Sequence, residues 1–278
     1  MDRNFRFGGE RDDGLQVLWE DGEHVFGKGR ARADGNWIDV LAVLPAAEHP
    51  SPASFDRLTH EYELKDELDG TGAVRPLELI RERGRTMLML EDFGGEPLER
   101  LLGQPLELGA FLRFAIGIAA ALGKVHHRGL VHKDIKPAKI LVNRASGEVR
   151  LTGFGIASRL PRERQMLEPP ETIAGTLAYM APEQTGRMNR SIDSRSDLYS
   201  LGVTFYQMLT GSLPFTASDP MEWVHCHIAR QPLAASKRLE NIPAPVSQLV
   251  MKLLAKTAEE RYQTATGVES DLRRCLAA

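Results

Sequence analysis

The pattern of apolar residues changes once along this chain, at residues 91–98, and this change limits the folds that the chain can adopt. In the part before it, short apolar stretches are separated by turn residues, which predicts the strands of an antiparallel sheet. The predicted strands cover 15–19, 24–27, 37–44 and 86–90. Asp34-Gly35-Asn36 predicts a hairpin turn, and apolar residues near helical spacing predict one helix at 54–68.

After residue 97 the apolar residues recur at helical spacing, as they do in buried helices. The predicted helices cover 108–127, 195–209, 221–229, 245–255 and 265–276. Two short strands, 140–143 and 149–151, are predicted between the first two of these helices. A small sheet-rich part, 1–92, followed by a larger helical part, 93–278, predicts an α+β fold of two lobes with a cleft between them.

The charge and the cysteine content exclude several classes of protein. The 278 residues hold 35 Lys and Arg against 38 Asp and Glu, so we expect no nucleic-acid partner that binds through gross charge. Cys226 and Cys275 are too few for a disulfide scaffold or a C-x-x-C zinc site. No apolar leader precedes the first strand, and the longest apolar stretch, 111–122, is interrupted by Arg113 and too short for a bilayer. We therefore expect a cytoplasmic protein without membrane insertion.

The segment 130–142 carries the residues best suited to chemistry. An apolar pair precedes His132, Asp134 and Lys136, on a loop predicted between a helix and a strand. A carboxylate there can accept a proton from a substrate hydroxyl, and a nearby ammonium can neutralise a transferring phosphoryl group. Taken alone, an Asp-x-Lys sequence would more commonly be a surface ion pair.

Several further motifs, in order along the chain, favour the chemical interpretation. Segment 130–142 resembles the catalytic loop of protein kinases, and Gly175-Thr176-Leu177-Ala178-Tyr179-Met180-Ala181-Pro182-Glu183 resembles their segment ending in Ala-Pro-Glu. Residues 197–203 resemble the Asp-x-x-Ser-Leu-Gly helix that follows it. The resemblance implies a bilobal protein-kinase fold, with Asp134 and Lys136 as residual catalytic residues. It also implies structural roles for His132, Glu183, Asp197 and Arg261. Of these, Arg261 is the arginine that pairs with Glu183, the glutamate of Ala-Pro-Glu.

A narrower resemblance concerns His132-Lys133-Asp134 and the segments 184–190 and 224–229. These are similar to the N-terminal kinase-like domains of large bacterial hybrid sensor histidine kinases. This likeness implies a signalling module of a two-component system. Its partners would then be proteins or neighbouring signalling domains.

Three positions depart from the kinase pattern where the family holds ATP and magnesium. Val43 falls at the lysine position, which leaves Glu61, the usual partner of that lysine, without its cation. Gly153 replaces the aspartate that binds magnesium, and Lys139 replaces the asparagine that is the second metal ligand. A dication would meet an ammonium where it needs oxygen atoms, so we expect no usual magnesium site.

The loop that should cradle the phosphates, 18–25, is also atypical. It contains one glycine, Gly22, and three carboxylates, Glu20, Asp21 and Glu23, which repel a triphosphate. We therefore expect either no cofactor or weakly bound ATP. If a nucleotide does enter, the resemblance implies that Val25, Leu41 and Leu141 would enclose the base. The other contacts would come from Leu90 at the back wall, Glu91 to Phe93 along the hinge, Thr152 and Lys139.

Three functions remain open at this point. A pseudokinase would act as a regulatory or interaction module with impaired phosphotransfer. An atypical active Ser/Thr kinase would use Asp134 as the base, with Lys136 and Lys139 holding the ATP phosphates. A nucleotide-binding switch would keep the base slot without transferring phosphate.

Overall fold

The computed structural model describes residues 5–6, 16–33, 36–82, 85–159, 177–188 and 190–278. The predicted turn residues Asp34 and Gly35 lie outside the described residues, as do Gly175 and Thr176 of the motif that ends at Glu183.

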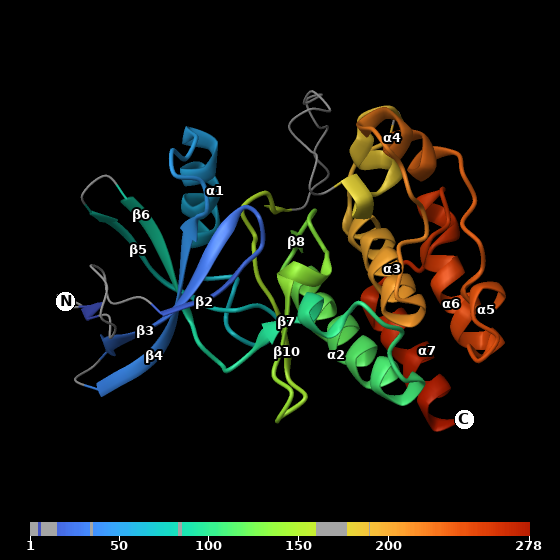
Figure 1. Ribbon diagram of the computed structural model, residues 1–278, viewed down its shortest axis with the longest axis horizontal. Coiled ribbons are helices and arrows are strands. Elements are labelled where there is room, and N and C mark those ends of the chain that lie inside the picture. Colours follow the sequence, from blue (N-terminus) through green and yellow to red (C-terminus); the bar gives the residue numbers. More distant parts are fainter. Residues whose placement is uncertain (1–4, 7–15, 34–35, 83–84, 160–176, 189) are drawn as a thin grey trace.

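An antiparallel sheet forms the N-terminal lobe (Figure 1). The strand order is β1-β3-β4-β6-β5, and β2 pairs with β3. The strands are β1 (Phe5–Arg6), β2 (Gln16–Glu20), β3 (His24–Ala33), β4 (Asn36–Pro45), β5 (Pro76–Glu82) and β6 (Arg85–Glu91). Strand β5 was not predicted, because it begins with a proline and charged residues at 78, 81 and 82 interrupt its apolar residues.

Helix α1 (Pro52–Glu63) lies against this sheet (Figure 1). Ser51 caps its first turn by accepting a hydrogen bond from the Ser54 N–H, and Pro52 occupies a favourable first position. The predicted end at residue 68 was wrong, because the chain leaves the helix at Leu64. Leu64 and Leu68 are nevertheless buried, in the core of the other lobe, so their apolar spacing reflects packing rather than helix.

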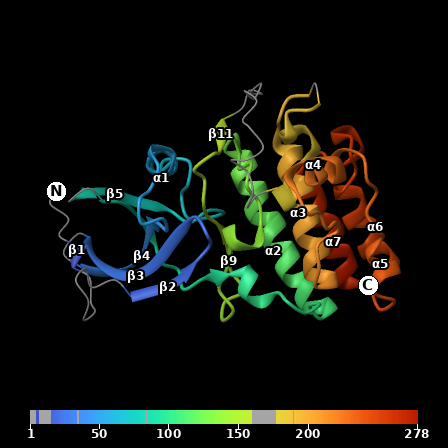
Figure 2. The same ribbon diagram turned by 45° about the horizontal axis from the view of Figure 1, so that its top comes forward.

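Helices form most of the C-terminal lobe, where α2 (Leu108–His127) packs against α3 (Ser194–Thr210) and α7 (Ala265–Ala277). The remaining helices are α4 (Pro220–Ile228), α5 (Ala235–Arg238) and α6 (Ala244–Leu253). Short strands face the sheet lobe: β7 (Glu96–Pro97), β9 (Ile140–Val142) and β10 (Val149–Leu151) form one small sheet, and β8 (Leu130–Val131) pairs with β11 (Ser158–Arg159). Figure 2 shows these strands between the N-terminal sheet and the helices. The predicted α+β fold of two lobes is confirmed.

The apolar stretch 111–122 is too short to span a membrane, but helix α2, which contains it, is longer. Its 20 residues are long and apolar enough to cross a membrane, with a mean hydropathy of 1.6 over the window concerned. Half of that window is buried inside the protein, where α2 contributes Phe111, Ile118 and Leu122 to the largest apolar cluster. These contacts are those of a core helix.

Candidate functional site

Asp197, in the first turn of α3, shapes the loop that follows β8. Its two carboxylate oxygens accept hydrogen bonds from the backbone N–H groups of His132 and Lys133, each at 2.8 Å. His126 Nε2 lies 2.9 Å from Oδ2 of the same carboxylate. Lys133 adopts a positive φ of 68°, a strained conformation for a lysine that these bonds hold in place.

Asp134 and Lys136 meet within this loop. Lys136 Nζ lies 3.1 Å from Asp134 Oδ2, and both residues are buried. The other oxygen of Asp134, Oδ1, is also buried, and it has no hydrogen-bond partner among the described residues. One oxygen of a positioned carboxylate is thus available to accept a proton.

His132 holds the loop against the strand that leads to Gly153. Its Nε2 lies 3.0 Å from the Thr152 carbonyl oxygen, and its Nδ1 accepts a hydrogen bond from the Asp134 N–H. Burial lowers the pKa of His132, against the opposite influence of Asp197 and Asp134. His132 is therefore uncharged, and its role in the loop is structural.

Lys139 joins the two lobes. Its Nζ lies 2.5 Å from Oδ2 of Asp21, in the β2–β3 turn, and both side chains are almost completely buried, at 2% and 1% exposure. Glu23 Oε2 is 3.9 Å away and His24 Nδ1 is 3.5 Å away. The other Asp21 oxygen accepts hydrogen bonds from the N–H groups of Glu23 and His24, so this one carboxylate both shapes the turn and binds the lysine.

The pKa values of Asp21 and Lys139 move in the directions that a stable ion pair requires. Burial alone would raise the pKa of Asp21, but His24 and Lys139 outweigh it and hold that pKa far below its ordinary value of 3.8. Burial alone would lower the pKa of Lys139, but the charges of Asp21 and Asp134 raise it above 10.5. Both groups are therefore charged at neutral pH.

Gly153 provides the space through which Lys139 reaches Asp21. A Cβ atom on Gly153 would lie 2.5 Å from Lys139 Cδ, closer than any real contact, and its φ of +79° also favours glycine. The Gly153 N–H donates a 3.0 Å hydrogen bond to Oε1 of Glu61, a buried residue of α1. From the sequence, Glu61 was expected to lack its usual cation. The structure directs this carboxylate to the Gly153 backbone, and Val43, at the usual lysine position, is buried.

Two arginines hold the β2–β3 hairpin from other sides. Arg100 Nη2 donates a 2.6 Å hydrogen bond to the Leu18 carbonyl oxygen, and its guanidinium lies over the Trp19 ring. Arg57 of α1 pairs with Glu23 at 3.3 Å. Together with Lys139, these contacts fix the hairpin against α1 and against the C-terminal lobe.

The residues suggested for a base slot fall into one apolar cluster, with one exception. Leu41, Leu90 and Leu141 are buried together, and Phe93 packs at the edge of their cluster. Val25 pairs with Leu44, so it points to the other face of β3, whereas the neighbouring Phe26 belongs to the cluster. The ring of Phe26 stacks on Trp19 with 4.9 Å between centroids.

Two of the other suggested contacts, Glu91 and Thr152, make backbone hydrogen bonds, and Glu91 Oε2 also lies 3.2 Å from Arg150 Nη1. The Glu91 N–H bonds to the Arg75 carbonyl, and the buried Thr152 donates its N–H to the Lys139 carbonyl oxygen at 3.0 Å. Sequence reasoning placed Asp21 in the acidic phosphate loop but missed its pairing with Lys139, and it missed Trp19 and Phe26 as members of the apolar cluster. Strand alternation could have indicated Phe26, but no local signal links Asp21 to Lys139, which is 118 residues away.

Glu183 and Arg261 meet in the helical lobe. Arg261 donates two hydrogen bonds to the carboxylate, at 2.7 and 2.9 Å, and both residues are buried. Ser196 donates a third bond to Glu183, and Arg261 also bonds the carbonyl oxygens of Ala255 and Arg195. The pair thus ties the segment after Ala181 to α3 and to the chain before α7.

Comparison with family models identifies this architecture. The model described as protein kinase domain matches residues 43–272. The chain belongs to the protein kinase family. The region matched includes the loop of Asp134, the Glu183–Arg261 pair and helices α1 to α6.

Bacterial serine/threonine kinases are among the relatives of this kinase domain. It is 38% identical to serine/threonine-protein kinase PknB of Mycobacterium tuberculosis over 154 residues, 55% of this chain and 24% of the relative. It is 36% identical to serine/threonine-protein kinase Pkn1 of Myxococcus xanthus over 196 residues, 69% of this chain and 28% of the relative. A probable serine/threonine-protein kinase of Streptomyces coelicolor, SCO3848, is 34% identical over 191 residues, 68% and 28% of the two chains. The matches span about a quarter of each relative.

The residues of this kinase domain do not fit the magnesium ions of the family. Position 139 holds a buried ammonium that is already paired, and position 153 has no side chain to bind a metal. In the part of the chain that the structure describes, no group of three or more His, Cys, Asp or Glu side chains is arranged to hold a metal ion. We therefore derive no step that passes through magnesium.

Proposed function

We propose that this kinase domain is a pseudokinase, a Ser/Thr-kinase-like signalling module that regulates or binds other proteins with impaired phosphotransfer. The observation that carries the proposal is the buried Lys139–Asp21 ion pair, which crosses Gly153. It sets a fixed positive group where the family needs metal-binding oxygens. The same ion pair fixes the β2–β3 hairpin, which should cradle phosphates, through the carboxylate of Asp21.

The magnitude of the losses supports an impaired enzyme. Kinases act almost entirely by positioning and by stabilising charge on the transferred phosphoryl group. Removing a single charge-stabilising contact commonly costs about 10²–10³ in rate, although such losses do not simply add. Here the phosphate-binding lysine and both metal ligands are replaced, at Val43, Gly153 and Lys139.

Thermal unfolding with ATP, with and without magnesium, tests this proposal. We expect no change in the melting temperature of the unmodified protein at millimolar ATP, since a ligand stabilises a fold only as far as it binds. The combined variant Val43→Lys, Lys139→Asn, Gly153→Asp, with Asp21→Asn to avoid a buried unpaired charge, should gain a magnesium-dependent shift. Magnesium-dependent phosphorylation of a generic substrate by the unmodified protein, abolished in Asp134→Asn, would contradict the proposal.

A second candidate function is an atypical active Ser/Thr kinase. It is favoured by the Asp134 carboxylate, which lies beside Lys136 and keeps one oxygen without a hydrogen-bond partner among the described residues. Asp134 would act as the base, and Lys136 and Lys139 would hold the ATP phosphates in place of a metal. A thermal shift with ATP that needs no magnesium and disappears in Lys139→Ala would support this candidate and count against the first.

We also propose that the module works beside other signalling domains in the cytoplasm, in a protein of the hybrid sensor histidine kinase type. Support comes from the likeness of segments 184–190 and 224–229. The matched relatives are serine/threonine kinases, and the match spans about a quarter of each, so they support only that a kinase domain of this kind can be part of a longer protein. The sequence of the full gene product tests this. A P-loop ATPase module and a histidine-kinase core after this domain would support it, and an unrelated neighbour would not.

A further inference from the structure

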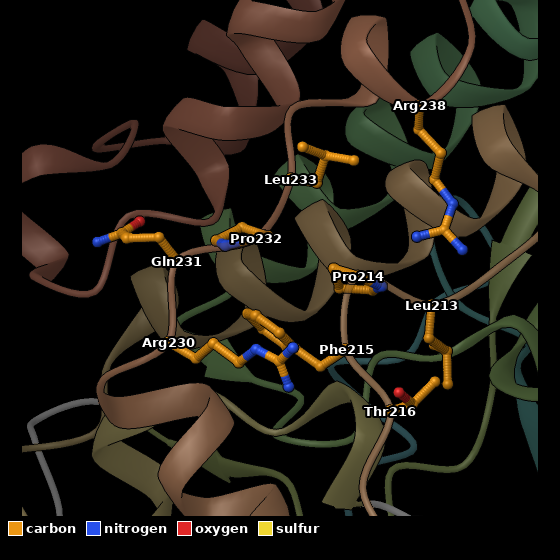
Figure 3. A pocket seen from close by; sticks show the side chains of 9 residues that line it. All are labelled: Leu213, Pro214, Phe215, Thr216, Arg230, Gln231, Pro232, Leu233 and Arg238. Carbon is orange, nitrogen blue, oxygen red and sulfur yellow. The ribbon is translucent and has the colours of Figure 1, made fainter.

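A pocket lies on the helical lobe, between the segment that follows α3 and the segment that connects α4 to α5 (Figure 3). Its volume is about 410 Å³, within the range of sites that hold a few side chains or a small ligand. It shares no lining residue with the loop of Asp134 or with the β2–β3 hairpin. The pocket is therefore separate from the kinase-like site.

The pocket has an apolar floor and an apolar rim. Pro214, Phe215 and Pro232 are buried and form the floor. The Leu233 side chain borders the pocket and is 50% exposed, which is high for a large apolar side chain. The lining thus offers apolar contacts beside polar groups, as ligand pockets do.

Two arginines give the pocket its charge. Figure 3 shows Arg230 and Arg238 on opposite sides of Pro214, and no acidic residue lines the pocket. Lys256 does not line the pocket, but its Nζ lies 4.6 Å from the centroid of the Phe215 ring.

In the part of the chain that the structure describes, the two guanidinium groups contribute little to the fold. Within the described ranges, Arg238 has no ion-pair partner. Arg230 acts only through space on Glu222 of α4, whose carboxylate already accepts two hydrogen bonds from Ser218. The pocket therefore offers an apolar floor between cations that remain available to an anionic ligand.

We propose that this pocket binds an acidic segment of a partner protein. An aliphatic or aromatic side chain of that segment enters over Phe215 beside Leu233, and carboxylates on either side of it pair with Arg230 and Arg238. The arginine fork suits carboxylates, and two cations on opposite sides of one apolar floor suit an extended peptide. The proposal names a partner class for the interaction role but does not depend on nucleotide chemistry, so ATP titration and peptide titration can fail separately.

Fluorescence anisotropy with labelled synthetic peptides tests the proposal on the full chain. The probe is Asp-Glu-Phe-Glu-Asp, and its controls replace Phe by Ala or the acidic residues by Lys. Arg238→Glu and Arg230→Glu should each weaken binding of the probe about ten-fold. The matched control is Lys237→Glu, an exposed neighbour that makes the same charge change outside the pocket. It should change binding by less than about two-fold.

Every outcome of this titration either supports or overturns the proposal. The proposal is supported if the arginine variants lose affinity, the Ala peptide binds less tightly than the probe, and the melting temperatures of all variants stay equal. It is overturned if Arg238→Glu and Lys237→Glu weaken binding equally, or if no peptide binds. It is also overturned if an oligonucleotide of the same charge binds as tightly as the probe, because gross charge would then explain the binding.

Discussion

Lys139 and Asp21 place two opposite charges where water cannot reach them. Removing charged groups from water is costly, and their attraction offsets the cost only when the geometry is good and the remaining polar atoms are satisfied. Asp21 meets this condition, since one of its oxygens bonds two backbone N–H groups and the other bonds Lys139. Removing one partner alone should therefore lower the free energy of unfolding far more than replacing both partners together.

Lys139→Met tests the energy of the pair. It removes the ammonium but keeps the length of the side chain, so the free energy of unfolding should fall by about 3–5 kcal/mol. Asp21→Asn should act in the same direction, and the double variant should lose less than the sum of the two. Urea denaturation measures all three. Lys237→Met, at an exposed lysine, is the control and should stay within about 0.5 kcal/mol. Additive effects would show that the two residues do not interact.

The pH dependence of stability should identify Asp21 as a buried anion. Because its pKa is lowered by folding, its contribution is complete above the ordinary value of 3.8 and is lost as the pH falls toward the folded value. The stability advantage of the unmodified protein over Asp21→Asn should therefore shrink below about pH 4. At the alkaline end, the contribution of Lys139, whose pKa is raised, is complete below 10.5 and lost at higher pH. An advantage over Asp21→Asn that stays constant from neutral pH to pH 2 would contradict this assignment.

Gly153→Ala should be destabilising for two separable reasons. The positive φ costs about 1–2 kcal/mol for alanine, and the new Cβ collides with the Lys139 side chain. In a Lys139→Ala background the collision disappears and only the backbone cost remains. The measured cost of Gly153→Ala should therefore be smaller in that background. Equal costs in both backgrounds would show that Lys139 does not pass over Gly153.

At the scale of elements, the β2–β3 hairpin is fixed by contacts far from it in the sequence. Lys139, Arg100 and Arg57 reach it from the C-terminal lobe and from α1. The sequence predicted the two strands and the acidic turn, and the carboxylates of that turn were expected to repel phosphate. Its partner became visible only when the fold brought residue 139 beside residue 21.

Hydrogen exchange should report this fixation. In Lys139→Met, the Asp21 carboxylate loses its counterion, and its bonds to the Glu23 and His24 N–H groups should weaken. Exchange of hairpin amides should rise, whereas amides of the buried helix α3 should exchange as before. An unchanged hairpin would show that Arg57 and Arg100 suffice to hold it.

The Glu183–Arg261 pair joins elements of the helical lobe and should be equally sensitive. Glu183→Ala leaves the Arg261 guanidinium buried without its carboxylate, so the domain should lose about 3–5 kcal/mol. The matched control is Glu259→Ala, which removes an exposed ion pair with Arg190 and should cost less than about 1 kcal/mol. Thermal unfolding compares the two, and an unchanged melting temperature in Glu183→Ala would contradict a structural role for the pair.

At the scale of the whole molecule, packing crosses the position where the sequence divides. Leu64, Leu68 and Ala73, in the first 92 residues, are buried in the core cluster of the helical lobe. Sequence motifs predicted the two-lobed fold because they mark the helical lobe in order along the chain. They could not show that the segment after α1 belongs to the other core, since its apolar spacing looks like more helix.

This shared core predicts that the two lobes unfold together. Trp19 and Trp37 lie in the sheet lobe, and Trp223 lies in α4 of the helical lobe. A Trp223→Phe variant and a Trp19→Phe, Trp37→Phe variant therefore report on one lobe each. In urea, the fluorescence transition of each variant should coincide with its own transition by circular dichroism, as in two-state unfolding. Separate midpoints within one variant would show that the lobes are independent.

The close contact between Lys139 and Gly153 also restricts which substitutions this protein can accept. An asparagine at position 139 would leave the buried Asp21 carboxylate without its counterion. An aspartate at position 153 would collide with the Lys139 side chain. Each single step back toward a metal-binding site thus weakens the fold before it restores any chemistry. Restoring the usual metal ligands without this loss of stability therefore requires replacements at positions 21, 139 and 153 together.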